Sequence, residues 1–484
     1  MKLPPLNLDR SAGALSRQLY DGLREAILAG QFRAGTRLPS TRSLAGELGV
    51  SRNTVHTAFE QLTLEGLLEG KQGNGTFVAD VPLSAPFRRG ATEPDPPRGR
   101  RSLSRQGRAI QALDARWPQR IHLPGEYRGK AFGLGAPADL YPDRVWRKLL
   151  VQCWDTMARA RQLGRSEYEP LKETIAEHLG LTRGVRCSPD QVILVSGSQQ
   201  GIALSASVLL EPDDSVWVED PGYFGNHTAL VGWGARVVPV PVDDQGLSVV
   251  AGRELAPQAR LVHVTPTHQF PLGRTMPLQR RADLLEWARS ADAWILEDDY
   301  DSEFRYAGAP LPALQGIDPD QRVLYLGSFS KSLFSGLRLA YLVVPSDLVS
   351  IFKAVRQAAG GPPPVLEQAV VARFLTEGHY QRHLRRMRRT YAQRQRWLVD
   401  AVRAELGGLL HVDPDETGMH LVGWLRNGMT GEDACARAAD EGLELLPLSS
   451  YRAAPGPEGV LLGFSEVGER SLQQGVKLLR RALT

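Results

Sequence analysis

The amino-terminal part of the chain has the hydrophobic spacing of short amphipathic helices. Leu15, Leu19, Leu23 and Ile27 recur every four residues, so they share one face of a helix that Gly30 ends. The stretch "RLPSTRSLAGELGVSRNTVHTAFEQL" predicts two more helices with serine N-caps. Ser40 and Ser51 are the predicted N-caps, and Gly49 separates the two helices. Val55, Phe59 and Leu62 form the apolar face of the second helix.

A glycine-rich hairpin is predicted after these helices. "LLEGKQGNGTFVAD" alternates apolar and polar residues around its glycines, as two antiparallel strands do. Three helices and a hairpin make a winged helix, whose wing places Gly75 and Thr76 beside a phosphate or the minor groove. The third helix then presents its first turn to base edges in the major groove. The residues at that end are Arg52, Asn53, Thr54 and His56.

From about residue 125, short apolar runs alternate with longer amphipathic stretches such as Pro277–Ser290. The predicted strands are "QVILVSG", "SVWVED", "ARLVHVTP", "AWILEDD", "RVLYLGS" and "LRLAYLVV". This alternation predicts a mostly parallel sheet covered by helices, with its chemistry at the strand ends. No G-x-G-x-x-G opens the first strand, so a dinucleotide-binding fold has little support.

Composition narrows the class of protein. A chain of 484 residues, 42% hydrophobic and 23% charged, predicts a soluble protein of two or three domains. Cys153, Cys187 and Cys435 are unpatterned, which favours a reducing cytoplasm and neither disulfides nor a metal site. "MKLPPLNLDR" lacks the apolar core of a signal peptide, and no run is apolar enough for a membrane helix. We therefore expect a cytoplasmic protein without membrane contact.

A basic linker is predicted between the two parts. Residues 81–120 contain nine arginines against three acidic residues and include "TEPDPPRGRR". So few apolar residues cannot build a core, so residues 80–124 are expected to be a flexible tether. The arginines either stay solvated or loosely contact DNA phosphates.

The segment "SFSKSLFSGLR" carries the most distinctive candidate chemistry. Lys331 follows a predicted strand, and pyridoxal phosphate needs such a lysine, whose amine forms a Schiff base with the cofactor aldehyde. Arg338 suits a phosphate as a bidentate donor, and Ser328 and Ser330 supply hydroxyl groups. A lone lysine after a strand is usually a surface group, so the neighbours carry this prediction.

Three other segments add partners for such a cofactor. Ser196–Gly201 ("SGSQQG") offers a strand-to-helix turn whose amide groups suit a phosphate. Asp298 in "EDDYDSEF" is placed at a strand end, where a carboxylate keeps a pyridine nitrogen protonated. Tyr300 is expected near the phenolic oxygen of the ring, and Tyr223 in "EDPGYF" is expected to stack on its face.

Each of the two parts of the chain resembles a known protein family. "RLPSTRSLAGELGVSRNTV" resembles the signature of the GntR family of winged-helix regulators, over roughly residues 11–78. That resemblance implies DNA contacts by Arg42 and Arg52, with Arg37 a weaker candidate. The order Ser-Gly-Ser, aromatic, Asp and Ser-x-Ser-Lys resembles fold-type I aminotransferases over about residues 130–484. It implies an internal aldimine at Lys331, and ring and phosphate contacts from Asp298, Tyr223, Ser198, Gln199, Ser328 and Arg338.

The whole chain resembles the MocR/GabR subfamily of GntR regulators, for which "EDDYDSEF" and "HQFPLG" are typical. The resemblance implies a winged helix-turn-helix domain over 11–79, the linker over 80–124, and an α/β aminotransferase-like domain over 125–484 with a small C-terminal α+β subdomain. It also implies pyridoxal 5'-phosphate as cofactor, a double-stranded DNA operator as partner, and a homodimer that reads two half-sites.

Two positions depart from the aminotransferase pattern. The chain has "FPLG" where "NPTG" is usual, so Phe270 stands at the position of a ring-oxygen asparagine, and Gln269 or His268 is a candidate substitute. The late arginine that holds a substrate α-carboxylate corresponds to Leu461 in "GVLLGFSEV". Loss of that charge-assisted contact, about 1.5–3 kcal/mol per hydrogen bond, argues against amino-acid transamination.

Three functions remain open at this stage. The first is a regulator that senses pyridoxal phosphate or an amine at Lys331, with control of vitamin B6 synthesis or of amine metabolism. The second is a working aminotransferase with an attached DNA-binding domain. The third is a DNA-binding protein whose large domain only dimerises. The set of Lys331, Asp298 and Arg338 argues against the third, and Leu461 argues against the second.

A basic helical stretch from Arg385 to Arg396 has two interpretations. One is a solvated helix face with Tyr391 and Trp397 turned inward, and the other is a surface that faces DNA or a second subunit.

Overall fold

A computed structural model describes most of the chain. Its described residues are 8–10, 13–71, 74–80, 103–116, 131–135, 138–159, 167–308, 311–426 and 428–484. They form two compact units, Met1–Ser102 and Leu103–Thr484. Each unit is described by itself.

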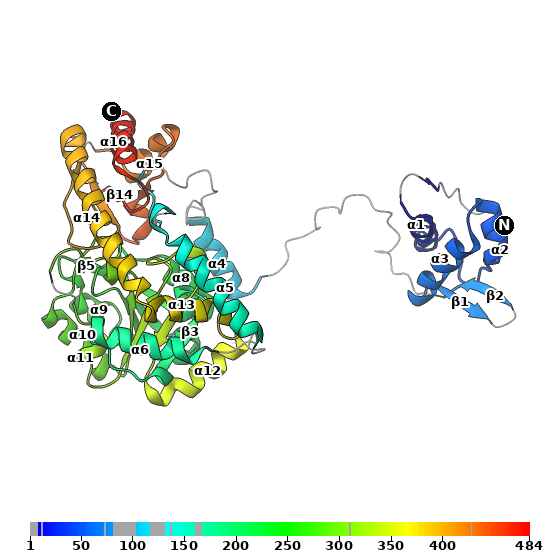
Figure 1. The fold of residues 1–484 in the computed structure, drawn as a ribbon, viewed down its shortest axis with the longest axis horizontal. Helices are drawn as coiled ribbons and strands as arrows, with labels where there is room; N and C mark the ends of the chain where they lie inside the picture. Colours follow the sequence, from blue (N-terminus) through cyan, green and yellow to red (C-terminus); the bar gives the residue numbers. More distant parts are fainter. Residues whose placement is uncertain are drawn as a thin grey trace. The chain divides into compact units, whose positions relative to one another are not determined.

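The first unit has three helices followed by a two-stranded antiparallel hairpin (Figure 1). The elements are α1 (Leu15–Leu28), α2 (Thr41–Leu48), α3 (Arg52–Leu64), β1 (Leu68–Lys71) and β2 (Gly75–Val78). This is the predicted winged helix. Leu19, Leu23, Val55 and Leu62 are fully buried in its core, as the four-residue spacing predicts.

Local hydrogen bonds fix the ends of the helices in this unit. The Ser40 hydroxyl accepts from the Ser43 amide, and the Ser51 hydroxyl accepts from the Thr54 amide, each at 3.1 Å. Gly49 between the two helices has a φ of 66°, a left-handed conformation in which a side chain is strained. Both predicted N-caps and the predicted break are therefore present.

The second unit is built on an eight-stranded sheet with the order β3-β10-β9-β8-β7-β4-β5-β6. Neighbours from β9 to β5 run parallel, while β10 is antiparallel to both of its neighbours and β6 is antiparallel to β5. The strands are β3 (Val192–Val195), β4 (Ser215–Asp220), β5 (Arg236–Asp243), β6 (Gly246–Leu247), β7 (Leu261–Val264), β8 (Trp294–Asp299), β9 (Val323–Ser328) and β10 (Ala340–Val343).

Helices cover both faces of this sheet. Alternate residues of β3 show the two faces, because Ile193 and Val195 pack in one cluster while Val192 and Leu194 pack in another. The helices of the large sheet region are α5 (Asp143–Arg159), α6 (Glu169–Arg183), α7 (Ser198–Leu209), α8 (Gly225–Trp233), α9 (Val249–Leu255), α10 (Leu278–Ser290), α11 (Leu314–Ile317), α12 (Val349–Ala358) and α13 (Val365–Thr376).

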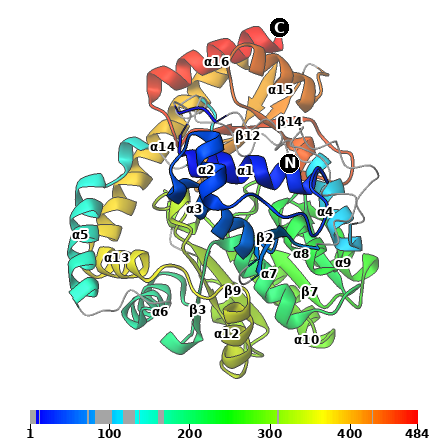
Figure 2. The same ribbon diagram turned by 90° about the vertical axis from the view of Figure 1, so that its right-hand side faces the viewer.

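The long helix α14 (His379–Leu406) leads from the large sheet to a smaller α+β region at the carboxyl end (Figures 1 and 2). That region contains an antiparallel sheet with the order β11-β12-β14-β13, covered by α15 and α16. Its elements are β11 (Leu410–Val412), β12 (His420–Leu425), α15 (Gly431–Asp440), β13 (Leu446–Pro447), β14 (Gly459–Gly463) and α16 (Glu469–Leu483).

The basic stretch predicted from Arg385 to Arg396 lies on α14. Tyr391 is fully buried, and Trp397 packs partly buried against the core, while Arg385, Arg386 and Arg389 are exposed. The stretch therefore has an inward apolar face and an outward basic face.

One expectation about the linker needs correction. Within the predicted flexible segment 80–124, Arg105–Arg116 form a helix, α4, which packs on α8. Arg105 pairs with Asp213 at 3.2 Å, and Ile110 lies against Gly232. Apolar positions in this otherwise basic stretch give the helix a face to bury. The rest of that prediction, residues 81–102 and 117–124, lies outside the described residues.

Two features are absent from the described residues. No described helix is long and apolar enough to cross a membrane. Among the same residues, no group of three or more histidine, cysteine or acidic side chains is arranged to hold a metal ion.

Candidate functional site

Lys331 lies just after β9, at the carboxyl end of the parallel strands. Its Nζ atom donates a hydrogen bond to the carbonyl oxygen of Leu134 at 3.4 Å. Burial lowers the pKa of Lys331, and the negative charges of Asp301 and Glu466 act in the opposite direction. A lysine with a lowered pKa has more neutral amine at physiological pH, and the neutral amine is the nucleophile.

The loop that carries Lys331 is held by several hydrogen bonds. The Ser328 hydroxyl at the end of β9 accepts from the Ser330 amide at 3.1 Å. Tyr380 donates to the Ser332 hydroxyl at 2.9 Å, and His383 Nε2 lies 2.9 Å from the Ser332 carbonyl oxygen. The contacts from α14 fix the backbone just after the lysine, and the bond between Ser328 and Ser330 fixes it just before.

Asp298 lies near the end of β8, beside β9, and is 7% exposed. One of its carboxylate oxygens lies 3.3 Å from His263 Nε2, and His263 Nδ1 lies 3.1 Å from the Asn226 side-chain amide. An amide that donates to Nδ1 leaves the ring hydrogen on Nε2, where it points at Asp298. Asp298 was predicted from the sequence, whereas the two side chains that orient it were not.

The predicted phosphate-binding groups meet at the start of α7. Gly197 at the N-cap has a φ of 101°, and Ser198 and Gln199 form the first turn. The Arg338 guanidinium donates to the Ser196 carbonyl oxygen at 3.2 Å and forms no ion pair within the described part of the chain. A helix N-terminus beside an unpaired arginine attracts a phosphate.

Two tyrosines lie near these groups. The Gln199 amide donates to the Tyr223 hydroxyl at 3.1 Å. Phe270 contacts both rings edge-on, with centroids 6.2 Å from Tyr223 and 6.0 Å from Tyr300. The structure therefore brings Tyr223, Gln199 and Tyr300 into one neighbourhood with Phe270.

A buried polar network behind Tyr300 was not predicted. His268 Nδ1 lies 2.8 Å from Asp301 and 3.0 Å from the Tyr300 hydroxyl, and Nε2 lies 3.6 Å from Asp415. Burial alone lowers the pKa of His268, but Asp301 and Asp415 outweigh it and raise this pKa to about 10. His268 is therefore a buried cation that joins the large region to the loop before β12.

Gln269 points elsewhere. Its amide nitrogen donates to the Pro221 carbonyl oxygen at 2.9 Å and to Glu219 at 3.3 Å, and its oxygen accepts from the Leu272 amide at 3.1 Å. These partners occupy the side chain inside the protein. Of the two candidate substitutes for the asparagine, His268 is the one that contacts Tyr300.

The position of the substrate arginine is apolar. Leu461 is 1% exposed and packs in a cluster with Leu446, Leu448 and Tyr451. Phe270 packs against this cluster, and its ring centroid lies 5.1 Å from that of Tyr451. The position that corresponds to the substrate arginine therefore holds a buried hydrocarbon side chain.

The chemistry of this donor set fits pyridoxal phosphate. An amine, a carboxylate oriented by a histidine, two tyrosines and a helix N-terminus with an arginine match its aldehyde, pyridine nitrogen, ring and phosphate. All of them lie at or near strand ends of one sheet, where ligands of α/β proteins bind.

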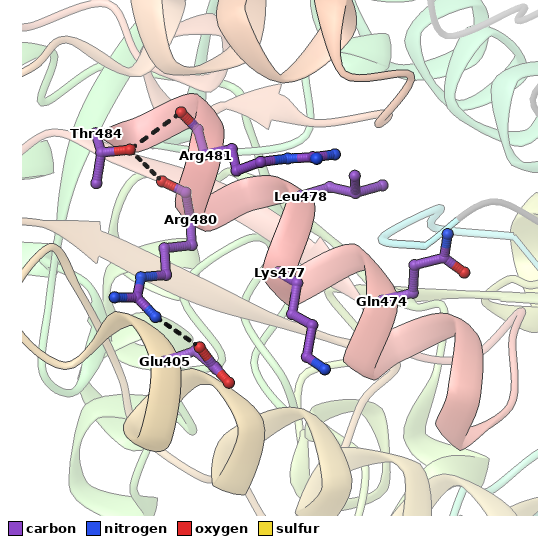
Figure 3. A pocket seen from close by; sticks show the side chains of 7 residues that line it. All are labelled: Glu405, Gln474, Lys477, Leu478, Arg480, Arg481 and Thr484. Carbon is purple, nitrogen blue, oxygen red and sulfur yellow. Dashed lines mark hydrogen bonds and ion pairs between the residues drawn. The ribbon is translucent and has the colours of Figure 1, made fainter.

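A hollow elsewhere on the second unit does not compete with this site. Figure 3 shows it between the ends of α14 and α16, where Arg480 pairs with Glu405 at 2.9 Å. None of the predicted site residues lines it.

In the first unit, the predicted DNA-contacting arginines are available. Arg42 on α2 and Arg52 at the start of α3 are exposed, and neither forms an ion pair with another described residue. Asn53 is exposed beside them, and the Thr54 hydroxyl lies 2.8 Å from that of Ser51. His56 pairs with Glu60 at 3.3 Å.

The wing lies beside the start of α2. Thr76 accepts a backbone hydrogen bond from Leu38 at 2.9 Å, and Gly75 has a φ of 104°. A Cβ on Gly75 would lie 3.1 Å from the Arg37 guanidinium, so this arginine packs against the wing. Arg37, Gly75 and Thr76 therefore form one surface.

Each of the two units matches a known protein family. Residues 15–78 match the family of bacterial regulatory proteins called gntR, and residues 132–458 match aminotransferase class I and II. A probable rhizopine catabolism regulatory protein, MocR, of Rhizobium meliloti is 40% identical over 99% of this chain and 95% of its own length. The chain belongs to the MocR/GabR subfamily of GntR transcriptional regulators.

Other relatives have the same two-part organisation or share the second unit. The regulator TauR of Rhodobacter capsulatus is 32% identical over 97% of each chain. Among solved structures, the α-aminoadipate aminotransferase of Thermus thermophilus is 28% identical, with a TM-score of 0.69 over 79% of this chain and 98% of its own. The second unit therefore has the fold-type I aminotransferase fold, whose relatives depend on pyridoxal phosphate. The relatives support a transcriptional regulator over a working aminotransferase.

Proposed function

We propose that this regulator holds pyridoxal 5'-phosphate on Lys331 and that an amine, or the cofactor itself, is its effector. Pyridoxal phosphate supplies an aldehyde carbon to which either the Lys331 amine or the amine of a small molecule binds covalently. Binding at this site changes the affinity of the winged helix for operator DNA. A regulator of pyridoxine biosynthesis, PdxR of Corynebacterium glutamicum, is 30% identical over 95% of this chain, which supports this class of control.

The residues have distinct roles in the proposal. Lys331 binds the aldehyde, and Asp298, oriented by His263, pairs with the pyridine nitrogen. Tyr223 packs on the ring face and Tyr300 faces its phenolic oxygen. Four residues around the start of α7 bind the phosphate: Ser198, Gln199, Ser328 and Arg338. The Gln269 side chain is bound to internal partners and makes no ring contact in this proposal.

On the DNA side, the exposed first turn of α3 reads the major groove. Arg52, Asn53 and His56 face the bases, while Thr54 also holds the N-cap. Arg42 contacts the phosphate backbone, and Gly75 and Thr76 of the wing approach the minor groove. We further propose a cytoplasmic homodimer, so that two winged helices bind two half-sites.

One observation carries the proposal. It combines two features: the proposed cofactor ligands Lys331, Asp298 and Arg338 all lie at or near strand ends of one sheet, and buried Leu461 stands at the position expected for the substrate arginine. Retention of the cofactor site without that arginine fits sensing better than turnover. The alternative, transamination, would be supported by steady turnover of an amino acid with a keto acid.

The test measures cofactor binding and DNA binding on the same full-length protein. Wild type and Lys331→Ala are titrated with pyridoxal phosphate, and visible absorbance and affinity for the upstream region of the gene are recorded. We expect an absorbance band and a change in DNA affinity for wild type, and neither for Lys331→Ala. A wild type that stays colourless with added cofactor overturns the proposal.

A further inference from the structure

The carboxylate of Glu466 lies beside the backbone that contacts Lys331. Glu466 follows β14, in the loop before α16. A Cβ on Gly133 would lie 2.8 Å from its Oε2 atom, and a Cβ on Gly135 would overlap the same carboxylate. Leu134 between these glycines accepts the hydrogen bond from Lys331. Glycine on both sides therefore lets a negative charge approach the peptide that contacts the amine.

Among the described residues, this carboxylate has no hydrogen-bond or ion-pair partner. Glu466 is half-buried, and within the described ranges no hydrogen bond or ion pair holds it. Its neighbour Ser465, in contrast, donates to the Gly135 carbonyl oxygen at 2.6 Å. The negative charge of Glu466 acts to raise the pKa of Lys331 and of Tyr391. A half-buried carboxylate without a partner favours a cation brought by a ligand.

One member of the apolar cluster, Leu461, lies on β14, the strand that precedes Glu466. Leu461 belongs to β14, five positions before Glu466, and packs with Tyr451 and Phe270. A ligand carboxylate against these side chains would lose its hydration without gaining a counter-charge. Close to Glu466 it would also meet a like charge. The apolar cluster and Glu466 therefore both disfavour binding of an amino acid, because an amino acid carries a carboxylate.

We infer that the effector is a primary amine without a carboxylate, and that Glu466 binds a second positively charged or hydrogen-bond-donating group on it. The inference rests on the proposed function, because it assigns the ligand class of the site at Lys331. Because Glu466 and Leu461 select among ligands, diamines and amino alcohols should bind better than amino acids.

Three ligands with the same four-carbon skeleton test the selection. Diaminobutane ends in an ammonium group, aminobutane in a methyl group and γ-aminobutyrate in a carboxylate. Each is titrated into the full-length protein loaded with pyridoxal phosphate, and the visible absorbance of the bound cofactor is followed. We expect diaminobutane to reach half-saturation at a concentration about tenfold lower than γ-aminobutyrate, a difference of about 1.4 kcal/mol, with aminobutane between them.

Two variants assign the effect to its residue. Glu466→Gln is expected to weaken diaminobutane about tenfold and to leave aminobutane unchanged. Glu469→Gln, in the exposed first turn of α16, is the matched control and should leave all three ligands unchanged. Unchanged cofactor absorbance in each ligand-free variant shows that the site is folded.

Several results overturn the inference. They are a wild type that prefers γ-aminobutyrate, a Glu466→Gln variant with unaltered ligand order, and a protein in which none of the three amines changes the absorbance. In each case, a cofactor band that depends on Lys331 and a cofactor-dependent DNA affinity would leave the proposed function standing. Loss of that band and of that dependence would remove both.

Discussion

His268 Nδ1 lies 2.8 Å from a carboxylate oxygen of Asp301, with both side chains buried. The same imidazole reaches Asp415, in the loop between β11 and β12, with its other nitrogen. A cation between two carboxylates therefore joins the sheet that carries the cofactor site to the smaller carboxyl-terminal region. The Tyr300 hydroxyl shares this histidine.

Replacement of His268 should change the pH dependence of stability. Because its folded pKa is raised from 6.5 to about 10, its charge stabilises the fold fully below about pH 6.5, and this contribution is lost as pH rises towards 10. His268→Gln leaves Asp301 unpaired, so we expect a loss of about 3–5 kcal/mol at pH near 6.5 and a much smaller one near pH 10. Urea unfolding at several pH values measures the difference.

A control for that experiment is His411→Gln. His411 makes an exposed pair with Asp413 at 3.0 Å, which is expected to contribute about 1 kcal/mol at most. If His268→Gln and wild type differ by the same free energy at every pH, the charge assigned to His268 is incorrect.

His263 is expected to set the affinity for the cofactor through Asp298. His263→Leu removes the hydrogen bond to the carboxylate, which is worth about 1.5–3 kcal/mol for a charged partner. Pyridoxal phosphate should therefore bind about 10–100 times more weakly, while the winged helix keeps its DNA affinity in the absence of cofactor. Fluorescence titration gives the dissociation constant. An unchanged constant would show that Asp298 needs no orienting partner.

Arg338 is expected to act on the phosphate group alone. Arg338→Gln should weaken pyridoxal phosphate about 10–100-fold, because a charge-assisted contact is lost. Binding of pyridoxal, which lacks the phosphate, should stay within about twofold of wild type. Competition between the two compounds measures both. Equal weakening of both ligands would contradict a phosphate-specific role.

The first turn of α3 is expected to read DNA. Arg52→Ala should weaken binding to the operator by about 1–3 kcal/mol if Arg52 contacts a base. Arg17→Ala is the control, because Arg17 is also exposed but pairs with Asp21 on α1 at 3.1 Å. Electrophoretic mobility shifts at fixed salt measure both variants. Equal affinity of Arg52→Ala and wild type would place the reading surface on another element.

Much of the fold could be predicted because its signals are local. The six apolar runs are the strands β3, β4, β7, β8, β9 and β10, since each is buried on both faces and reads as a continuous hydrophobic segment. Strand β5 was missed. Its sequence "RVVPVPVD" contains Pro239 and Pro241, which indicate a break, and it is paired on its outer side only by the two residues of β6.

The candidate site could be predicted only where a motif carries it. Lys331, Asp298 and Arg338 stand in recognisable segments. His263 and Asp415 do not, because they meet Asp298 and His268 only after folding, across 35 residues in the first case and from another region in the second. Glu466 does not belong to a recognisable motif either. Its proximity to the backbone around Leu134 is seen only in the folded protein, at Gly133 and Gly135.

The attachment of α4 to α8 sets the reach of the DNA-binding head. With Arg105 anchored at Asp213, only residues 81–102 separate the two described segments. Even a fully extended chain of that length spans at most about 75 Å, roughly two turns of B-form DNA. In the proposed homodimer, two such segments and the distance between their attachment points together limit the spacing of the half-sites, and shortening the segment should narrow the spacings that the protein tolerates.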